Sequence, residues 1–116
     1  MVKLNRSEKI ARKAVQMPGA QGVFVRRLIT REDGAQNFVM RLFELEPGGH
    51  TPRHHHAHEH EVYVLSGRGS VVGARGETPL EAGSAVFVTP QEEHQFVNGG
   101  SETLVFLCLV PATADG

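Results

Sequence analysis

Histidine is concentrated in one stretch of this 116-residue chain, between Pro47 and Gly67. Six of the seven histidines lie there, and the seventh, His94, stands alone downstream. A neutral imidazole offers a nitrogen lone pair at physiological pH, which makes histidine the commonest metal ligand in proteins. So dense a group beside strand-like apolar sequence predicts a metal site. The six clustered residues are His50, His54, His55, His56, His58 and His60.

The spacing of these histidines suits a site built on β-strands. Strand side chains alternate between two faces, so His54 and His56 would point the same way, and His58 and His60 share their parity. A bend is expected at residues 57–59, which would let His60 return to the same point. His94 opens a later strand and could reach that point from the far side of a barrel.

The rest of the chain reads as short strands separated by turns. Apolar, β-branched segments recur at intervals of about 8–12 residues, and 13 Gly and 6 Pro punctuate the chain. This pattern predicts an all-β fold, an antiparallel sandwich or closed barrel. The expected strands are residues 14–17, 23–30, 38–45, 61–65, 69–73, 78–80, 85–88, 94–97 and 103–110.

We expect one domain over residues 1–116. Residues 1–16 are expected to form an N-terminal arm or edge strand, with a short helix capped by Ser7 as the alternative. Residues 112–116 are expected to be a frayed tail. Four aromatic or sulfur-containing side chains are expected in the core or pocket wall, namely Phe38, Met40, Phe96 and Phe106.

Composition limits the partners and the compartment. Twelve Lys and Arg against 13 Asp and Glu give a formal charge of −1, which does not predict nucleic-acid binding. The single cysteine, Cys108, rules out an internal disulfide and fits a reducing compartment. No apolar run approaches the roughly 20 residues of a membrane span, and the first residues lack the apolar core of a secretory signal. We therefore expect a cytoplasmic protein with neither a nucleic-acid nor a membrane partner.

Two patterns of glycine and histidine resemble the sequence motifs of the cupin superfamily. The first motif, G-x5-H-x-H-x3,4-E-x6-G, is matched by Gly48, His54, His56, His60 and Gly67. It is matched with one departure, since histidine stands at position 60 where the motif has glutamate. The likeness is closest to small single-domain cupins with a four-histidine site.

The second motif, G-x5-P-x-G-x2-H-x3-N, is matched by Gly83, His94 and Asn98. Here Pro90 lies one place later than the motif's proline, and the motif's glycine is replaced. The distance from Gly83 to His94 is nevertheless kept, so the resemblance holds at the position that supplies the histidine.

The resemblance implies a conical antiparallel β-barrel of jelly-roll type, usually a homodimer, that holds one divalent metal and no other cofactor. The implied ligands are His54, His56, His60 and His94. Four neutral imidazoles leave the ion's +2 charge uncompensated, so the site would attract anionic or readily deprotonated ligands. Manganese or iron is favoured, although nickel, copper and zinc also accept imidazole.

Several residues keep two interpretations at this stage. Glu61 could be the fourth ligand, with His60 facing away. His58 could be an acid or base at the pocket rim or a solvent-exposed residue. Cys108 could be a small buried hydrophobe or face the metal cavity. Arg41 is expected on the solvent face, with the alternative that it balances an anion in the cavity.

The resemblance implies a metal-dependent oxidoreductase of dioxygenase type that acts on a small organic substrate in the barrel pocket. His58, Arg41 and Cys108 are its candidate catalytic residues. A metal-dependent isomerase or lyase is an alternative, as is a non-catalytic binding or sensor protein. A purely structural zinc is the least favoured, because such sites lean towards cysteine ligands.

Overall fold

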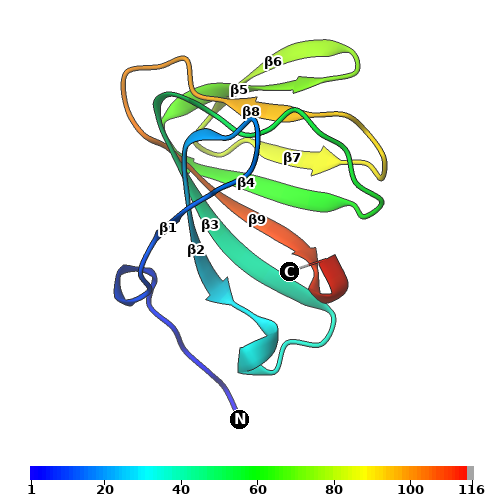
Figure 1. The fold of residues 1–116 in the computed structure, drawn as a ribbon. Coiled ribbons are helices and arrows are strands. Elements are labelled where there is room, and N and C mark those ends of the chain that lie inside the picture. Colours follow the sequence, from blue (N-terminus) through cyan, green and yellow to red (C-terminus); the bar gives the residue numbers. More distant parts are fainter. Residues whose placement is uncertain (115–116) are drawn as a thin grey trace.

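The computed structural model describes residues 1–114, which form nine β-strands and three short 3-10 helices. The predicted all-β fold is confirmed (Figure 1). The strands are β1 (Lys13–Ala14), β2 (Gln21–Ile29), β3 (Phe38–His50), β4 (His60–Ser66), β5 (Arg68–Gly73), β6 (Gly76–Glu81), β7 (Ala85–Val88), β8 (Gln95–Val97) and β9 (Leu104–Pro111). The helical turns are η1 (Ser7–Lys9), η2 (Arg31–Asp33) and η3 (Ala112–Ala114).

The strands form one antiparallel sheet in which β3 is central. The main path of the sheet runs β6-β5-β8-β3-β9-β4-β7. Strand β2 lies off this path and pairs with both β3 and β1. Figure 1 shows the sheet curled, with β5, β6 and β8 lying across from β2, β3 and β9. This curl encloses the core and the pocket described below.

One hydrophobic cluster fills the inside of the curled sheet. Every second residue of β9 is buried, beginning with Leu104 and ending with Val110, as the period of two in a strand requires. These side chains pack in one cluster with residues of β2, β3, β4, β6, β7 and β8. A flat sheet could not bring so many strand faces together. The core therefore supports the barrel predicted from the sequence.

Asn98 ties the turn before β9 to the centre of the sheet. Its side chain is fully buried, and its Nδ2 donates to the carbonyl oxygens of Leu45 and Glu102, both at 2.8 Å. Its Oδ1 accepts from the Gly100 amide at 3.0 Å. A buried amide with all these partners stabilises the fold rather than acting on a substrate. The last residue of the second motif is thus structural.

Strand β3 is longer than predicted, because it continues through Pro47 and the two glycines to His50. The sequence there is typical of a turn, but the segment is held by pairing with Asn98. The Gly48 amide donates to the Asn98 carbonyl at 2.8 Å, and the Asn98 amide donates to the Gly49 carbonyl at 2.9 Å. This extension carries the chain directly to the histidine stretch.

Both chain ends differ in part from prediction. At the N-terminus the 3-10 turn η1 begins at Ser7 and has no side-chain capping hydrogen bond, so the alternative of a helix capped by Ser7 is wrong. The edge strand β1 has two residues and shares only Ala14 with the predicted strand. At the other end, residues 112–114 are ordered by packing rather than frayed: Ala112 is buried, and its amide donates to the Asn37 carbonyl at 3.0 Å. Residues 115 and 116 of the predicted tail lie outside the described residues.

The prediction that Phe38 lies in the core is wrong. It is the first residue of β3, and 62% of its surface is exposed. Phe96 and Phe106 are buried as predicted, and Met40 is half-buried. None of the helical turns within residues 1–114 has the length and apolar character needed to cross a membrane.

Candidate metal centre and its pocket

Three separate pieces of chain bring the predicted ligands together. His54 and His94 lie opposite each other in an isolated antiparallel bridge, with their amides and carbonyls exchanging hydrogen bonds of 2.9 and 3.1 Å. His56 follows two residues later, and the predicted bend is present at residues 57–58. Ligand atoms of His54, His56 and His94 lie within 4.8 Å of one another, a spacing that a single metal ion could bridge.

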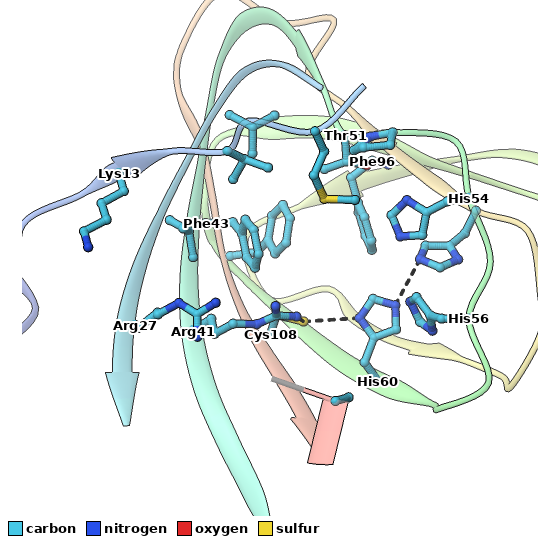
Figure 2. A pocket seen from close by; sticks show the side chains of 18 of the residues that line it. Lys13, Arg27, Arg41, Phe43, Thr51, His54, His56, His60, Phe96 and Cys108 are labelled. Carbon is cyan, nitrogen blue, oxygen red and sulfur yellow. Dashed lines mark hydrogen bonds between the residues drawn. The ribbon is translucent and has the colours of Figure 1, made fainter. Parts of the chain in front are cut away.

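The His60 imidazole borders the same group from the first position of β4. Its Nε2 lies 3.1 Å from His94 Nε2, and its ring centroid is 4.9 Å from those of His56 and His94. Figure 2 shows the rings of His54, His56 and His60 converging on one region. His60 is buried, whereas Glu61 is exposed, as expected for adjacent residues of a strand. The geometry does not support the alternative in which Glu61 replaces His60.

Backbone carbonyls fix which nitrogen of two imidazoles is free. The Nδ1 atoms of His94 and His56 lie 2.8 Å from the carbonyl oxygens of Glu92 and His58, respectively. A carbonyl only accepts, so each Nδ1 carries the hydrogen and each Nε2 presents a lone pair. The lone pair of His94 Nε2 can therefore accept a hydrogen bond from His60 Nε2 at 3.1 Å, and a change of tautomer at His60 would free both nitrogens for one cation. The donor chemistry fits a divalent metal.

Burial keeps these histidines in the neutral form that binds metals. Burial lowers the pKa of His60 to about 3, with smaller contributions from His94 and His56. Burial is also the largest cause that lowers the pKa of His94 and of His54. In addition, the Nδ1 of His54 is buried with no hydrogen-bond partner among the described residues. Metal binding at neutral pH would thus require no costly loss of protons.

The pKa of His60 predicts an acid-labile metal-free protein. The unfolded chain would protonate His60 near its ordinary pKa of 6.5, whereas the folded chain holds it neutral down to about pH 3. Its contribution to stability is therefore complete above pH 6.5 and is lost progressively as pH falls towards 3, by about 1.4 kcal/mol per unit. Urea unfolding of metal-free protein at about pH 7.5 and pH 5 should differ by roughly 2 kcal/mol from this residue alone.

Two variants test this assignment. His60→Gln keeps a polar side chain but cannot titrate, so it should show a smaller loss of stability on acidification than the unmodified protein. His55→Gln, at an exposed position, should keep the full pH dependence. An identical pH dependence in His60→Gln and the unmodified protein would contradict the prediction.

The histidines border a pocket of about 520 Å³ inside the barrel. Its apolar wall includes valines of β2 and the aromatic rings of Phe43, Phe96 and Phe106. The polar lining carries only neutral or cationic groups, and no described lining residue is a carboxylate. These polar lining residues are Lys13, Arg27, Arg41, Thr51, His54, His56, His58, His60, His94 and Cys108. The pocket can therefore receive a small organic molecule next to the histidines.

The candidate catalytic residues all line this pocket. His58 is half-buried and stacks on His56, with ring centroids 3.9 Å apart and planes 1° from parallel. Cys108 is buried and also faces the pocket, so both of its predicted interpretations hold. Its Sγ lies 3.2 Å from His60 Nδ1, and burial raises the pKa of the thiol.

The expected solvent-facing position of Arg41 is wrong. Its side chain lines the pocket, and its Nη2 donates to Cys108 Sγ at 3.5 Å. The reason lies in the register: Arg41 pairs with Cys108 across β3 and β9, and it shares the inward face of β3 with Phe43 and Leu45. Figure 2 shows its guanidinium beside the Cys108 sulfur.

Arg27 is a pocket residue that was not predicted: it borders the pocket from β2 and lies directly opposite Arg41 in the β2–β3 register. A signal was present, because Val23, Val25 and Arg27 alternate along one strand and so share a face. Two inward valines indicated that the arginine points inward as well.

A comparison with protein families identifies the fold. The cupin domain model matches residues 41–110, a segment that contains all four converging histidines. The chain belongs to the cupin family. The part of this cupin that precedes the matched segment adds β1 and β2, which carry Lys13 and Arg27 into the pocket wall.

Proteins similar to this cupin differ in their described activities. The polyketide cyclase RemF from Streptomyces resistomycificus has a TM-score of 0.91 and 37% identity, covering 97% of this chain and 80% of that chain. The oxalate-binding protein of Thermotoga maritima is 32% identical over 109 residues, which cover 90% of this chain and 88% of that protein. A 1-methylthio-D-xylulose 5-phosphate methylsulfurylase of Rhodospirillum rubrum is 37% identical over 76 residues. That match covers 66% of this cupin but only 49% of the methylsulfurylase, so the chain spans about half the length of this relative.

Proposed function

We propose that this cupin is a metal-dependent enzyme that acts on a small organic substrate in the barrel pocket. His54, His56, His60 and His94 would hold one divalent ion, with manganese or iron as the expected metals. The observation that carries the proposal is the convergence of four imidazoles, with the Nε2 atoms of His56 and His94 left as acceptors by their backbone contacts, beside a pocket of about 520 Å³.

The reaction that these residues support best is non-redox proton transfer, as in an isomerase, a lyase or a cyclase. A bound divalent metal acts as a Lewis acid that polarises a substrate oxygen and makes the C–H hydrogens on the adjacent carbon more acidic. His58 borders the pocket, and burial followed by His56 and Arg41 lowers its pKa, so it is neutral at pH 7 and can accept a proton. The apolar wall limits the access of water to the substrate.

Cys108 favours this chemistry over that of a dioxygenase. Its sulfur lies 3.2 Å from His60 Nδ1, so oxygen chemistry at the histidines would take place beside an oxidisable thiol. The similarity to a polyketide cyclase over nearly the whole chain points the same way. A dioxygenase is the second candidate, and the apolar pocket next to neutral ligands is the observation that favours it.

The experiment that tests the proposal compares metal-loaded and metal-free protein without oxygen. Elemental analysis first gives the metal content per chain. Small 1,3-dicarbonyl compounds and 2-hydroxyketones are then incubated in D2O, and exchange of their C–H hydrogens is followed by NMR. We expect exchange at least about 100-fold faster with the metal-loaded protein, as general acid–base catalysis supplies.

Each alternative gives a different result. Metal-dependent oxygen consumption with these or phenolic substrates, without anaerobic exchange, would replace the proposal by the dioxygenase. Tight binding of a panel compound with neither exchange nor oxygen consumption would favour a binding or sensor protein. Protein that binds no divalent metal would contradict the proposed function outright.

A further inference from the structure

Two arginines face each other across neighbouring strands at the pocket wall. Arg27 of β2 and Arg41 of β3 are direct partners in the antiparallel register, and both line the pocket. Like charges placed directly opposite on one sheet face are unfavourable in themselves. Both guanidiniums border the space beside the histidines (Figure 2). An anion bound at this point would gain from both of them.

Arg41 has donor groups that the protein does not use fully. One guanidinium nitrogen donates to the Cys108 sulfur at 3.5 Å, a weak acceptor, and the group lies 5.1 Å from the centre of the Phe43 ring. Its Nε is buried and has no hydrogen-bond partner among the described residues. A buried arginine donor without an acceptor costs free energy unless a ligand supplies one.

The described side chains that line the pocket around Arg41 are cationic, neutral or apolar. None of the described residues that line the pocket is an aspartate or glutamate, while Lys13 adds a third cationic side chain to the wall. Among the described residues that line the pocket, the permanently charged side chains are therefore all cationic.

We propose that Arg41 and Arg27 form an oxyanion subsite that holds a carboxylate or phosphate group of the substrate. The inference deepens the proposed function and rests on it, because it assigns the substrate class of the same pocket. Arginine suits this role since its planar fork of donors matches the oxygens of carboxylates and phosphates.

The geometry also limits the length of the substrate. A single sulfur atom, that of Cys108, separates the Arg41 guanidinium from the His60 imidazole. A substrate whose anionic group sits on Arg41 and whose reacting oxygen points to the histidines must carry the two groups only a few bonds apart. Its remaining atoms would lie against the apolar wall formed by Val23, Val25 and Phe43.

The test follows the binding of simple oxyanions to the full chain. Protein labelled with 15N and freed of metal is titrated with inorganic phosphate or with acetate in chloride-free buffer, and the Nε–Hε signal of Arg41 is observed by NMR. We expect saturable shifts of this signal with at least one of the two anions. The anion that binds more tightly assigns the substrate as a phosphate ester or as a carboxylic acid.

Variants separate the subsite from unspecific charge effects. Arg41→Gln should weaken binding at least about tenfold, the usual effect of removing a charged hydrogen-bond partner. Arg41→Lys should weaken it less, because charge is kept but the fork is lost. Arg75→Gln, in the exposed turn between β5 and β6, is the matched control and should change the dissociation constant less than twofold.

The outcomes for the subsite and for the metal are independent. Elemental analysis should find the same metal content in Arg41→Gln as in the unmodified protein. Failure to bind metal would contradict the proposed function while anion binding to metal-free protein would still support the subsite. Anion binding only to metal-loaded protein, or equal affinity in Arg41→Gln and the unmodified chain, would overturn the subsite.

Arg27→Gln provides a second variant if Arg41→Gln fails to fold. It should also weaken anion binding, because the proposed subsite uses both guanidiniums. A correctly folded Arg27→Gln and a folded Arg41→Lys that both bind phosphate and acetate as tightly as the unmodified protein would refute the subsite.

Discussion

Replacement of His94 by alanine is expected to abolish tight binding of the divalent metal and any activity that depends on it. His94 is 3% exposed and lies immediately before β8, far in sequence from the other three histidines. Its Nδ1 is held by the Glu92 carbonyl at 2.8 Å, which fixes the ring for coordination through Nε2. Loss of residues that merely orient a ligand weakens metal binding by about 10- to 100-fold, so loss of the ligand itself should exceed about 100-fold.

The measurement is metal content per chain after dialysis, together with competition against a chelator of known affinity. His55→Ala is the matched control, because His55 is an exposed histidine that lies between two proposed ligands. It should keep one metal ion per chain. A His94→Ala protein that keeps its metal with unchanged affinity would remove His94 from the ligand set.

The same measurement on His60→Ala addresses the fourth ligand separately. Among the described residues, His54, His56 and His94 have ligand atoms within 4.8 Å of one another, and His60 borders them through its contact with His94. A large loss of affinity in His60→Ala would support four-histidine coordination. Unchanged affinity would indicate a three-histidine site with His60 beside it.

The largest expected effect on stability comes from Gly67→Ala. Gly67 has a φ of +87°, a conformation that costs other residues about 1–2 kcal/mol. A Cβ there would also collide with the Thr103 carbonyl oxygen and lie 2.9 Å from Leu104 Cα, both of them backbone atoms. Relief of the clash would require the backbone after β4 to move away from the start of β9. We expect a loss of about 4 kcal/mol in the free energy of unfolding, from backbone strain and overpacking together.

Gly83→Ala is the matched control for Gly67→Ala. Its φ of +93° is nearly the same, but a Cβ there would have no described atom within 4 Å. It should therefore show the backbone cost alone, about 1 kcal/mol. Urea unfolding of both variants measures the difference. Equal losses in the two proteins would mean that the contact with Thr103 and Leu104 does not restrict this position.

The strands and their turns could be predicted because local sequence decides them. Alternating apolar residues and glycine-rich breaks identify β4 to β9 without any knowledge of the fold. The extension of β3 to His50 could not be predicted in this way. Pro47, Gly48 and Gly49 have turn-forming sequence, and pairing with Asn98, far along the chain, keeps them in the strand.

The direction of Arg41 was beyond local sequence for a related reason. Strand β3 buries residues on both faces, since Val39 and Leu45 are buried on one side and Leu42 on the other. Alternation therefore could not decide which face is inner, and the general preference of arginine for solvent favoured the wrong one. The histidines were predictable because their spacing is itself the signal.

The short bridge between His54 and His94 has a consequence for how the metal binds. Residues 51–59 carry two of the four histidines, His54 and His56, outside any named strand, and this bridge is one of few backbone attachments that fix them to the chain before β8. An ion that joins His94 to His54 and His56 would close the same loop that the two backbone hydrogen bonds close. Metal affinity and the local opening of this loop are then two measures of one coupled equilibrium. Any change that loosens the loop would lower the affinity without touching a ligand.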